Sequence, residues 1–215
     1  QKEFVKGEHI RFVRNPDYWQ KGKPYLDAVK IIVVADPAIR SAMLEKGEID
    51  RTVRLNDFDL ARLEKNKDVK IRVVPSTRQY YIALNHMVPA FANVNVRKAF
   101  NYAMDKTGIV KSVFADRGAV LAKAPTLSPG VYGYTEMTNS GEDTIFPFNL
   151  ARAKELMKNG GYEDRNKDGI VEDVKGNKLS LNLFTRRGGT QGDFQVAQLI
   201  QTFLKDLGVE VRIQV

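Results

Sequence analysis

The chain has 215 residues and carries 34 basic side chains against 26 acidic ones, which gives a formal net charge of +8. Basic residues are in excess both before and after residue 80, and no basic run is interleaved with aromatic residues. The charge therefore predicts a solvated basic surface and no nucleic-acid partner. The absence of cysteine excludes disulfides, thiolate metal sites and cysteine nucleophiles. No stretch approaches the length of about 18 consecutive apolar residues that a membrane-spanning helix requires.

The first expected elements are two strands, at residues 7–14 and 28–34, which are rich in valine and isoleucine. Between them lies the hexapeptide Arg14-Asn15-Pro16-Asp17-Tyr18-Trp19, whose Asn-Pro pair predicts a turn. Tyr18 and Trp19 carry large apolar surfaces with polar tips. We expect these two rings to anchor the turn on a core.

Two short helices are expected next. Asp36 is a suitable N-cap, Pro37 fits the first helical position and Gly47 ends the first helix. Asn56 is expected to cap the second helix, whose apolar side chains are Phe58, Leu60 and Leu63.

Alternating apolar residues predict two further strands, at residues 69–74 and 80–85. In the second of these, Tyr81 and Asn85 share one face, because successive side chains of a strand point to opposite sides. Two interpretations of Tyr81 stay open, namely a ligand contact and ordinary core packing.

Helical spacing of apolar residues predicts a helix at 96–104 and a second helix that begins after the N-cap Asp105. Residues 117–148 are rich in glycine, proline, serine and threonine, and this composition predicts a long loop. Asn149 is expected to cap a helix that ends at Gly160.

The C-terminal stretch predicts a strand, a helix and a second strand joined by short connections. Leu179, Leu181 and Leu183 alternate, an apolar helical stripe follows, and Gly208 separates that stripe from the alternating residues 209–215. Short connections of this kind make a βαβ unit with parallel strands. The switching between periods of about 3.6 and 2 residues places the chain in the α/β class.

Residues that could perform catalysis are scarce. His9 and His86 lie far apart in the sequence, without metal-ligand spacing, and there is no Gly-x-Ser-x-Gly motif of a nucleophile elbow. We therefore expect no enzymatic activity, although a pair of carboxylates that only folding brings together stays open at this point.

One acidic loop has the spacing of a calcium site. Asp164, Asn166 and Asp168 stand at alternate positions before Gly169, as in the first half of a calcium-binding loop. The twelfth position holds Lys175, where such a loop has a bidentate glutamate. Two interpretations stay open, a calcium site on these three residues and an Asp/Asn/Gly turn before the next strand.

The turn at residues 185–192 leaves the end of an expected strand and enters a helix. Ligands of open α/β sheets bind beyond the carboxyl ends of strands, and the free N–H groups of a helix N-terminus favour an anion. Arg186 and Arg187 add planar, permanently charged groups that suit a carboxylate. The alternative interpretation is that both arginines are solvated loop charges.

Four stretches, in this order along the chain, resemble the extracellular solute-binding proteins of family 5, the peptide- and nickel-binding receptors of bacterial ABC importers. They are residues 7–19, 36–50, 81–105 and 149–162. The resemblance implies a partial two-lobed α/β fold of the periplasmic binding protein type II kind, with mixed sheets and flanking helices. Since family members are longer, we expect a middle segment, with residues 1–78 in part of the first lobe and residues 79–215 in most of the second.

The same resemblance implies the substrate-binding component of a bacterial ABC importer, which captures short peptides in a cleft between the lobes. Arg187, or else Arg186, would clamp the peptide carboxylate, and the strand with Tyr81 and Asn85 would line the cleft. It further implies a monomer without a cofactor, a membrane permease as partner, and a periplasmic or extracellular location with a lipoprotein anchor in a Gram-positive host. The alternatives are a nickel-chelate or oligosaccharide receptor of the same fold, and the ligand-sensing domain of a transcription regulator.

Overall fold

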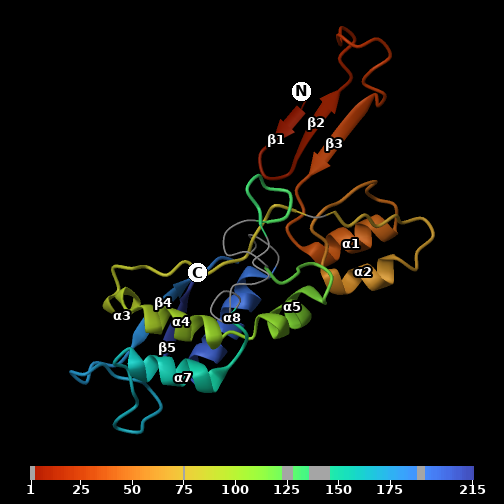
Figure 1. Cartoon of the computed structure of the whole chain (residues 1–215). Coiled ribbons are helices and arrows are strands. Elements are labelled where there is room, and N and C mark those ends of the chain that lie inside the picture. The colour runs from red at the N-terminus through yellow and green to blue at the C-terminus, as the bar shows by residue number, and fades with distance from the viewer. Residues whose placement is uncertain (1–2, 75, 123–127, 136–145, 188–191) are drawn as a thin grey trace. The chain divides into compact units, whose positions relative to one another are not determined.

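The computed structural model describes residues 3–74, 76–122, 128–135, 146–187 and 192–215 (Figure 1). The chain divides into two compact units, Gln1–Ile71 and Arg72–Val215, and each is described by itself. None of the helices in the described ranges has the length and apolar content that crossing a membrane requires. The division after residue 71 concerns compactness alone, so the assignment of residues 1–78 and 79–215 to two lobes stays a prediction.

The first unit begins with an antiparallel sheet in the order β1-β2-β3. Strand β2 (His9–Val13) pairs with β3 (Ala28–Ile32) in a register that places His9 opposite Ile32. Both strands fall within the predicted ranges. Strand β1 (Glu3–Val5) was not predicted, because three residues are too few to show an alternating pattern.

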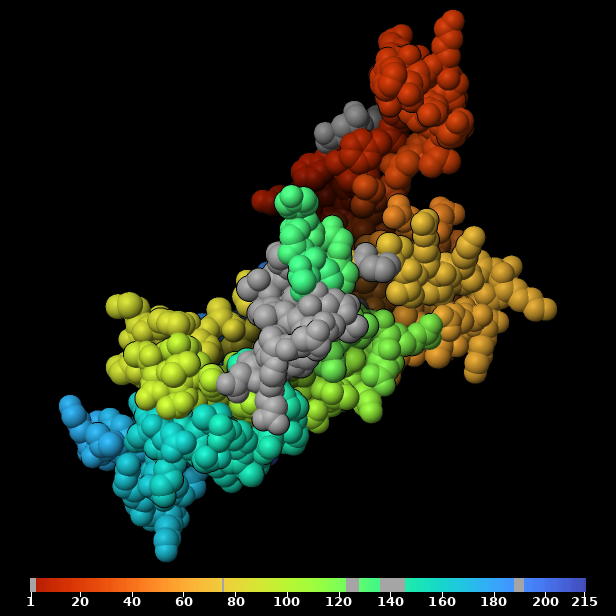
Figure 2. Space-filling view, in the orientation of Figure 1, coloured from red at the N-terminus to blue at the C-terminus, as the bar shows by residue number. Residues whose placement is uncertain are grey.

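The loop between β2 and β3 is held by Arg14. Its guanidinium donates to the carbonyl oxygen of Pro24 from Nε at 2.9 Å and from Nη2 at 2.7 Å, and its backbone N–H donates to the Asp27 carbonyl at 2.8 Å. Trp19 is 78% exposed and rests against the ring of Tyr18, with 5.9 Å between the centroids. The expectation that these rings anchor the turn on a core is therefore wrong for the described residues. Polar contacts of Arg14 hold the loop, and its apolar side chains Trp19, Tyr25 and Leu26 are exposed (this part of the chain is orange-red in Figure 2).

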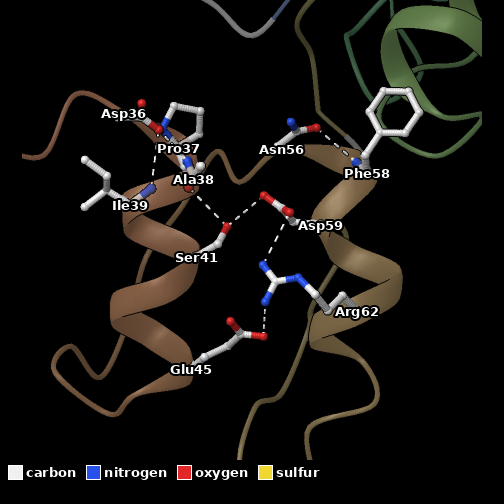
Figure 3. Close-up of polar contacts among 10 residues, drawn as sticks. All are labelled: Asp36, Pro37, Ala38, Ile39, Ser41, Glu45, Asn56, Phe58, Asp59 and Arg62. Carbon is white, nitrogen blue, oxygen red and sulfur yellow. Dashed lines mark hydrogen bonds and ion pairs between the residues drawn. The ribbon is translucent and has the colours of Figure 1, made fainter.

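Helices α1 (Pro37–Glu45) and α2 (Asp57–Leu63) begin at the predicted caps, Asp36 and Asn56. The Asp36 carboxylate accepts from the N–H groups of Ala38 and Ile39, and the Asn56 side chain accepts from that of Phe58 (Figure 3).

Polar side chains connect these two helices. The buried Ser41 hydroxyl lies 3.1 Å from both the Pro37 carbonyl oxygen and the Asp59 carboxylate, and Arg62 bridges Asp59 and Glu45 (Figure 3). The two carboxylates raise the pKa of the Arg62 guanidinium, Glu45 more than Asp59. A polar bridge thus accompanies the small apolar contact of Leu60 and Leu63, which are buried.

The second unit has the larger apolar core. It contains α3 (Pro89–Ala92), α4 (Val94–Tyr102), α5 (Lys106–Phe114), α7 (Leu150–Asn159), β4 (Ser180–Phe184), α8 (Asp193–Asp206) and β5 (Glu210–Gln214). Helix α4 packs along α7, and α8 packs on β5 (Figure 1). The centre of the core is formed by residues with almost no exposure, namely Val96, Ala99, Ala103, Ala153, Met157, Leu207 and Val209.

The predicted C-terminal βαβ unit is confirmed. Strands β4 and β5 are parallel, with Ser180 opposite Glu210, and α8 connects them. Gly208, with φ of +89°, follows the C-terminal end of α8 and separates it from β5, as expected.

The strands expected at 69–74 and 80–85 are wrong, since the described residues of both segments form no strand. An alternating pattern gives a segment two faces, but a strand also needs a neighbour that accepts and donates its backbone hydrogen bonds. Among the described residues neither segment has such a neighbour in a sheet.

Candidate functional site

The turn between β4 and α8 is fixed at both of its ends. The Thr185 N–H donates to the Gln214 carbonyl at 2.9 Å, and the Thr185 hydroxyl donates to the Asp193 carbonyl at 3.2 Å. Gly192 begins α8 as its N-cap with φ of +83°. The middle of the predicted turn, residues 188–191, lies outside the described residues.

Arg186 forms an ion pair with Asp193, the first residue of α8. Its Nε lies 3.3 Å from the Asp193 Oδ2, and the Asp193 side chain is only 15% exposed. The carboxylate at this position interacts favourably with the positive end of the helix dipole and offsets the charge of Arg186. Asp193 was not among the residues predicted from the sequence. Because its carboxylate lies at the N-terminus of α8, the positive potential there is lower than the two arginines and the helix end alone would give.

Arg187 is exposed and stacks on an aromatic ring instead. Its Cζ atom lies 4.3 Å from the centroid of the Phe194 ring, well inside the range of a cation–π contact. No ion pair joins Arg187 to another described residue. The aromatic contact does not neutralise the guanidinium, so its charge stays available to a ligand carboxylate.

Tyr81 and Asn85 lie on the surface of the second unit. Tyr81 is 80% exposed, so the core-packing interpretation of this residue is not supported by the described part of the chain. The Asn85 side-chain oxygen accepts from the N–H of Met87 at 3.0 Å, which stabilises the turn that follows. Tyr81 therefore has its phenol ring available for a partner, while one acceptor of Asn85 is already in use.

Phe114, at the end of α5, contacts both candidate segments. Its ring lies 4.9 Å from the ring of Tyr80, centroid to centroid. A Cβ atom placed on Gly192 would lie 3.2 Å from the Phe114 ring. Tyr80 and the start of α8 thus both lie next to the Phe114 ring. The sequence predicted the helix after Asp105, but nothing in the pattern indicated which segments Phe114 would contact.

The acidic loop at 164–169 is closed by its own hydrogen bonds. The Asp164 carboxylate accepts from the N–H groups of Asp168 and Gly169 at 3.1 and 2.9 Å, and the Asn166 side chain also accepts from Asp168. The Asp168 carboxylate pairs with Lys178, whose hydrogen bond is the main reason why the pKa of Asp168 is lowered.

These contacts support the turn interpretation, because a calcium ion would have to displace the Lys178 ammonium group. Within the described ranges, no group of three or more histidine, cysteine, aspartate or glutamate side chains could hold a metal ion.

Comparison with known sequences gives a match over the whole chain. Residues 1–215 match the family model described as bacterial extracellular solute-binding proteins, family 5 Middle. The oligopeptide-binding protein AppA of Bacillus subtilis (strain 168) is 33% identical over 215 residues, which are 100% of this chain and 38% of AppA. The glutathione-binding protein GsiB of Escherichia coli O6:K15:H31 is 35% identical over 162 residues, 75% of this chain and 29% of GsiB. The chain therefore spans well under half the length of these relatives.

Comparison with solved structures also gives matches to bacterial binding proteins over almost the whole chain. AppA from Bacillus subtilis in complex with a nonapeptide has a TM-score of 0.82 and 30% identity, over 99% of this chain and 40% of that one. DppA from Helicobacter pylori in complex with the peptide STSA has a TM-score of 0.73 and 26% identity, over 99% and 37% of the two chains. NikZ from Campylobacter jejuni in complex with Ni(L-His), at 24% identity over 99% and 40%, has a TM-score of 0.76 and shows the fold alone. This chain has part of a periplasmic binding protein type II fold and belongs to the bacterial extracellular solute-binding proteins of family 5.

Proposed function

We propose that the chain is part of the substrate-binding component of a bacterial ABC importer, and that this component captures short peptides. The observation that carries the proposal is the likeness to a peptide-bound receptor over 99% of the chain, at a TM-score of 0.82 and 30% identity. A relative named for glutathione, itself a short peptide, supports small ligands of the same chemistry. The protein acts as a receptor and not as an enzyme.

The proposed ligand contacts are on the second unit. Arg187, or else Arg186, faces the ligand carboxylate, and Tyr81 and Asn85 face its backbone. The exposure of Tyr81, the stacked guanidinium of Arg187 and the shared contact of both segments with Phe114 support this arrangement. Polar contacts to the ligand backbone and termini would tolerate variable side chains, as a receptor for mixed peptides requires.

The proposal includes the partners and the location. A membrane permease would receive the peptide, and the receptor would act as a monomer in the periplasm or outside the cell, with a lipoprotein anchor if the host is Gram-positive. Residues 1–78 and 79–215 would belong to different lobes of the receptor.

Ligand identification tests the proposal directly. The full-length protein is purified under native conditions, its ligands are extracted for mass spectrometry, and its thermal midpoint is measured with panels of short peptides, nickel chelates and oligosaccharides. We expect peptide masses and a rise of the midpoint with peptides alone. A rise only with chelates or oligosaccharides, or no rise with any panel, would contradict the peptide proposal.

A matched pair of tyrosines tests the site. Tyr81 and Tyr25 are 80% and 79% exposed, but Tyr25 lies in the β2–β3 loop of the first unit. Replacement of Tyr81 by alanine should weaken peptide binding by about fivefold or more, as truncation of a contacting aromatic costs at least about 1 kcal/mol. Tyr25→Ala should leave the affinity unchanged. Equal affinities of both variants and the wild type would remove Tyr81 from the site.

A further inference from the structure

Two adjacent arginines have different surroundings. Arg186 is paired with Asp193, and Arg187 is stacked on Phe194, so each arginine is held by the residue seven positions further along the chain. Asp193 and Phe194 are the first two residues of α8. The sequence shows two equivalent positive charges, whereas the structure gives them different partners.

We propose that Phe194 is a positioning residue, which holds the guanidinium of Arg187 ready for a ligand carboxylate, and that Arg186 has the structural role of pairing with Asp193. The inference rests on the proposed function, because it concerns the same turn. It decides between the two arginines and adds Phe194 to the binding site.

Asp193 makes Arg186 the poorer candidate for a ligand. With 15% exposure, the Asp193 carboxylate has lost most of its contact with water, and a charge in that position is costly unless it is paired. A ligand carboxylate that bound Arg186 would have to compete with this internal carboxylate. The Arg186–Asp193 pair is therefore better explained as a closure of the turn, alongside the bond from the Thr185 hydroxyl to the Asp193 carbonyl.

Phe194 makes Arg187 the better candidate. An aromatic face attracts the guanidinium without neutralising it, so the full positive charge stays available. The contact also restricts a long side chain before the ligand arrives, which lowers the entropy lost on binding. A salt bridge would restrict Arg187 equally well, but it would occupy the N–H groups that the carboxylate needs.

The helix that carries Phe194 is itself well fixed. Ala197, Ile200 and Leu204 of α8 are buried in the core, and Gly192 packs closely against Phe114 and Val113. Phe194 is half-buried in the first turn of this helix. Its ring therefore has a restricted position, and the contact restricts the Arg187 side chain in turn.

The test compares two probes on the full-length protein. One is a pool of random tripeptides with free carboxyl termini, and the other is the same pool with amidated termini. Apparent affinities are obtained from thermal-shift titrations of the wild type and of Phe194→Leu, Phe194→Tyr, Arg187→Gln and Arg186→Gln. The amide pool differs from the free-acid pool only at the terminal group, which loses its charge and one acceptor oxygen, so it separates positioning of Arg187 from a general effect on structure.

Phe194→Leu should weaken binding of the free-acid pool by about two- to fivefold, the size of a cation–π contact at a partly exposed site, and leave binding of the amide pool unchanged. Phe194→Tyr should restore wild-type affinity, because it keeps the aromatic face. Arg187→Gln should weaken the free-acid pool by about tenfold or more, and Phe194→Leu should add nothing in that background. Arg186→Gln should instead lower the thermal midpoint without ligand and change the affinity little.

Several results would overturn the inference. Equal losses for both pools in Phe194→Leu would reduce Phe194 to a structural residue, and a larger loss in Arg186→Gln than in Arg187→Gln would reverse the roles of the arginines. If Phe194→Leu does not fold, the two exposed arginine variants still decide which guanidinium binds the carboxylate. A wild-type protein that responds to neither pool would instead contradict the proposed peptide function.

Discussion

Gly192 shows how one residue can be required for two independent reasons. Its φ of +83° lies in the left-handed region, and a Cβ atom at this position would come within 2.6 Å of the Val113 side chain. Backbone preference and space therefore both favour glycine where the turn enters α8. Gly176 has the same φ of +83°, but a Cβ atom at that position would meet nothing within 4 Å, so Gly176 separates the two effects.

We predict that Gly192→Ala lowers the free energy of unfolding by about 2–4 kcal/mol, the sum of a positive-φ cost of about 1–2 kcal/mol and an overpacking cost of similar size. Gly176→Ala should show the backbone cost alone. Urea unfolding of both variants, followed by circular dichroism, measures the difference. Equal losses in the two variants would show that Val113 and Phe114 move aside without cost.

Asp168 carries a prediction about acid stability. Its pKa is lowered, first by the hydrogen bond from Lys178 and then by the N–H of Ile170. Because the folded state has the lower pKa, the carboxylate contributes stability above its unfolded pKa, and this contribution is lost as the pH falls through the folded pKa.

Lys178→Met should raise the pKa of Asp168 towards its ordinary value and make the acid-induced loss of stability smaller. An NMR titration of the Asp168 carboxyl carbon measures this change. Lys175→Met is the control, since Lys175 affects the pKa of Asp173. A titration midpoint of Asp168 that is unchanged in Lys178→Met would contradict the assigned cause.

At the scale of elements, the contact between α4 and α7 depends on a small residue. Gly160 caps α7 with an ordinary φ of −81°, but a Cβ atom there would lie 2.7 Å from a methyl group of Val96. Val96 is fully buried in α4, so it has little room to move. The close approach of these two helices therefore requires glycine for reasons of space and not of backbone conformation.

Gly160→Ala should destabilise the protein by about 1–3 kcal/mol, the usual cost of one extra methyl group in a packed core. In a Val96→Ala background the same change should cost less, because the obstructing methyl groups are gone. A double-mutant cycle on unfolding free energies measures this coupling. Additive losses would show that Val96 is not the obstruction.

The positions at which helices begin were the features most readily predicted from the sequence. The side chains of Asp36, Asn56, Asp105 and Asn149 all accept from backbone N–H groups at the starts of the expected helices, because a cap is a contact between residues two or three positions apart. The predicted strands that the structure confirms have a partner nearby in the sequence or within the βαβ unit. The strands predicted at 69–74 and 80–85 are wrong, since alternation says nothing about a distant neighbour.

For the candidate site too, the sequence predicted local features but not the contacts between residues across a turn. The sequence indicated Arg186 and Arg187 as carboxylate-binding residues through their place after a strand, and it indicated Tyr81 through family resemblance. It could not distinguish the arginines, because the residues that do so, Asp193 and Phe194, lie beyond a turn whose path is not encoded in any periodic pattern. Contacts across such a turn depend on backbone conformation, to which spacing arguments do not apply.

At the scale of the whole molecule, the two units differ in the amount of buried apolar surface. The hydrophobic cluster lies entirely in the second unit, on α4, α7, α8 and neighbouring residues. In the described part of the first unit, the buried side chains are Ser41, Asp57, Leu60 and Leu63, and every residue of β3 is exposed. Because local stability follows buried contacts, we expect local unfolding of the second unit to cost more free energy than local unfolding of the first unit.

Hydrogen exchange of the chain 1–215, followed by mass spectrometry, should show this difference. Amides of α4, α7 and α8 should exchange most slowly, and amides of β2 and β3 should exchange quickly despite their ladder hydrogen bonds. Protection in β3 equal to that in α8 would contradict the expectation and would indicate that the exposed sheet is covered in solution, for example by a second copy of the chain.

The exposed indole of Trp19 has a practical consequence for spectroscopy. It is the one tryptophan of the sequence, and it lies in a loop held by Arg14, outside the unit that contains the main core. Its emission should already be red-shifted in the native protein and should change little when that core melts. Fluorescence excited selectively at the indole would therefore report on the loop, and a denaturation curve recorded that way would understate the cooperativity of the core.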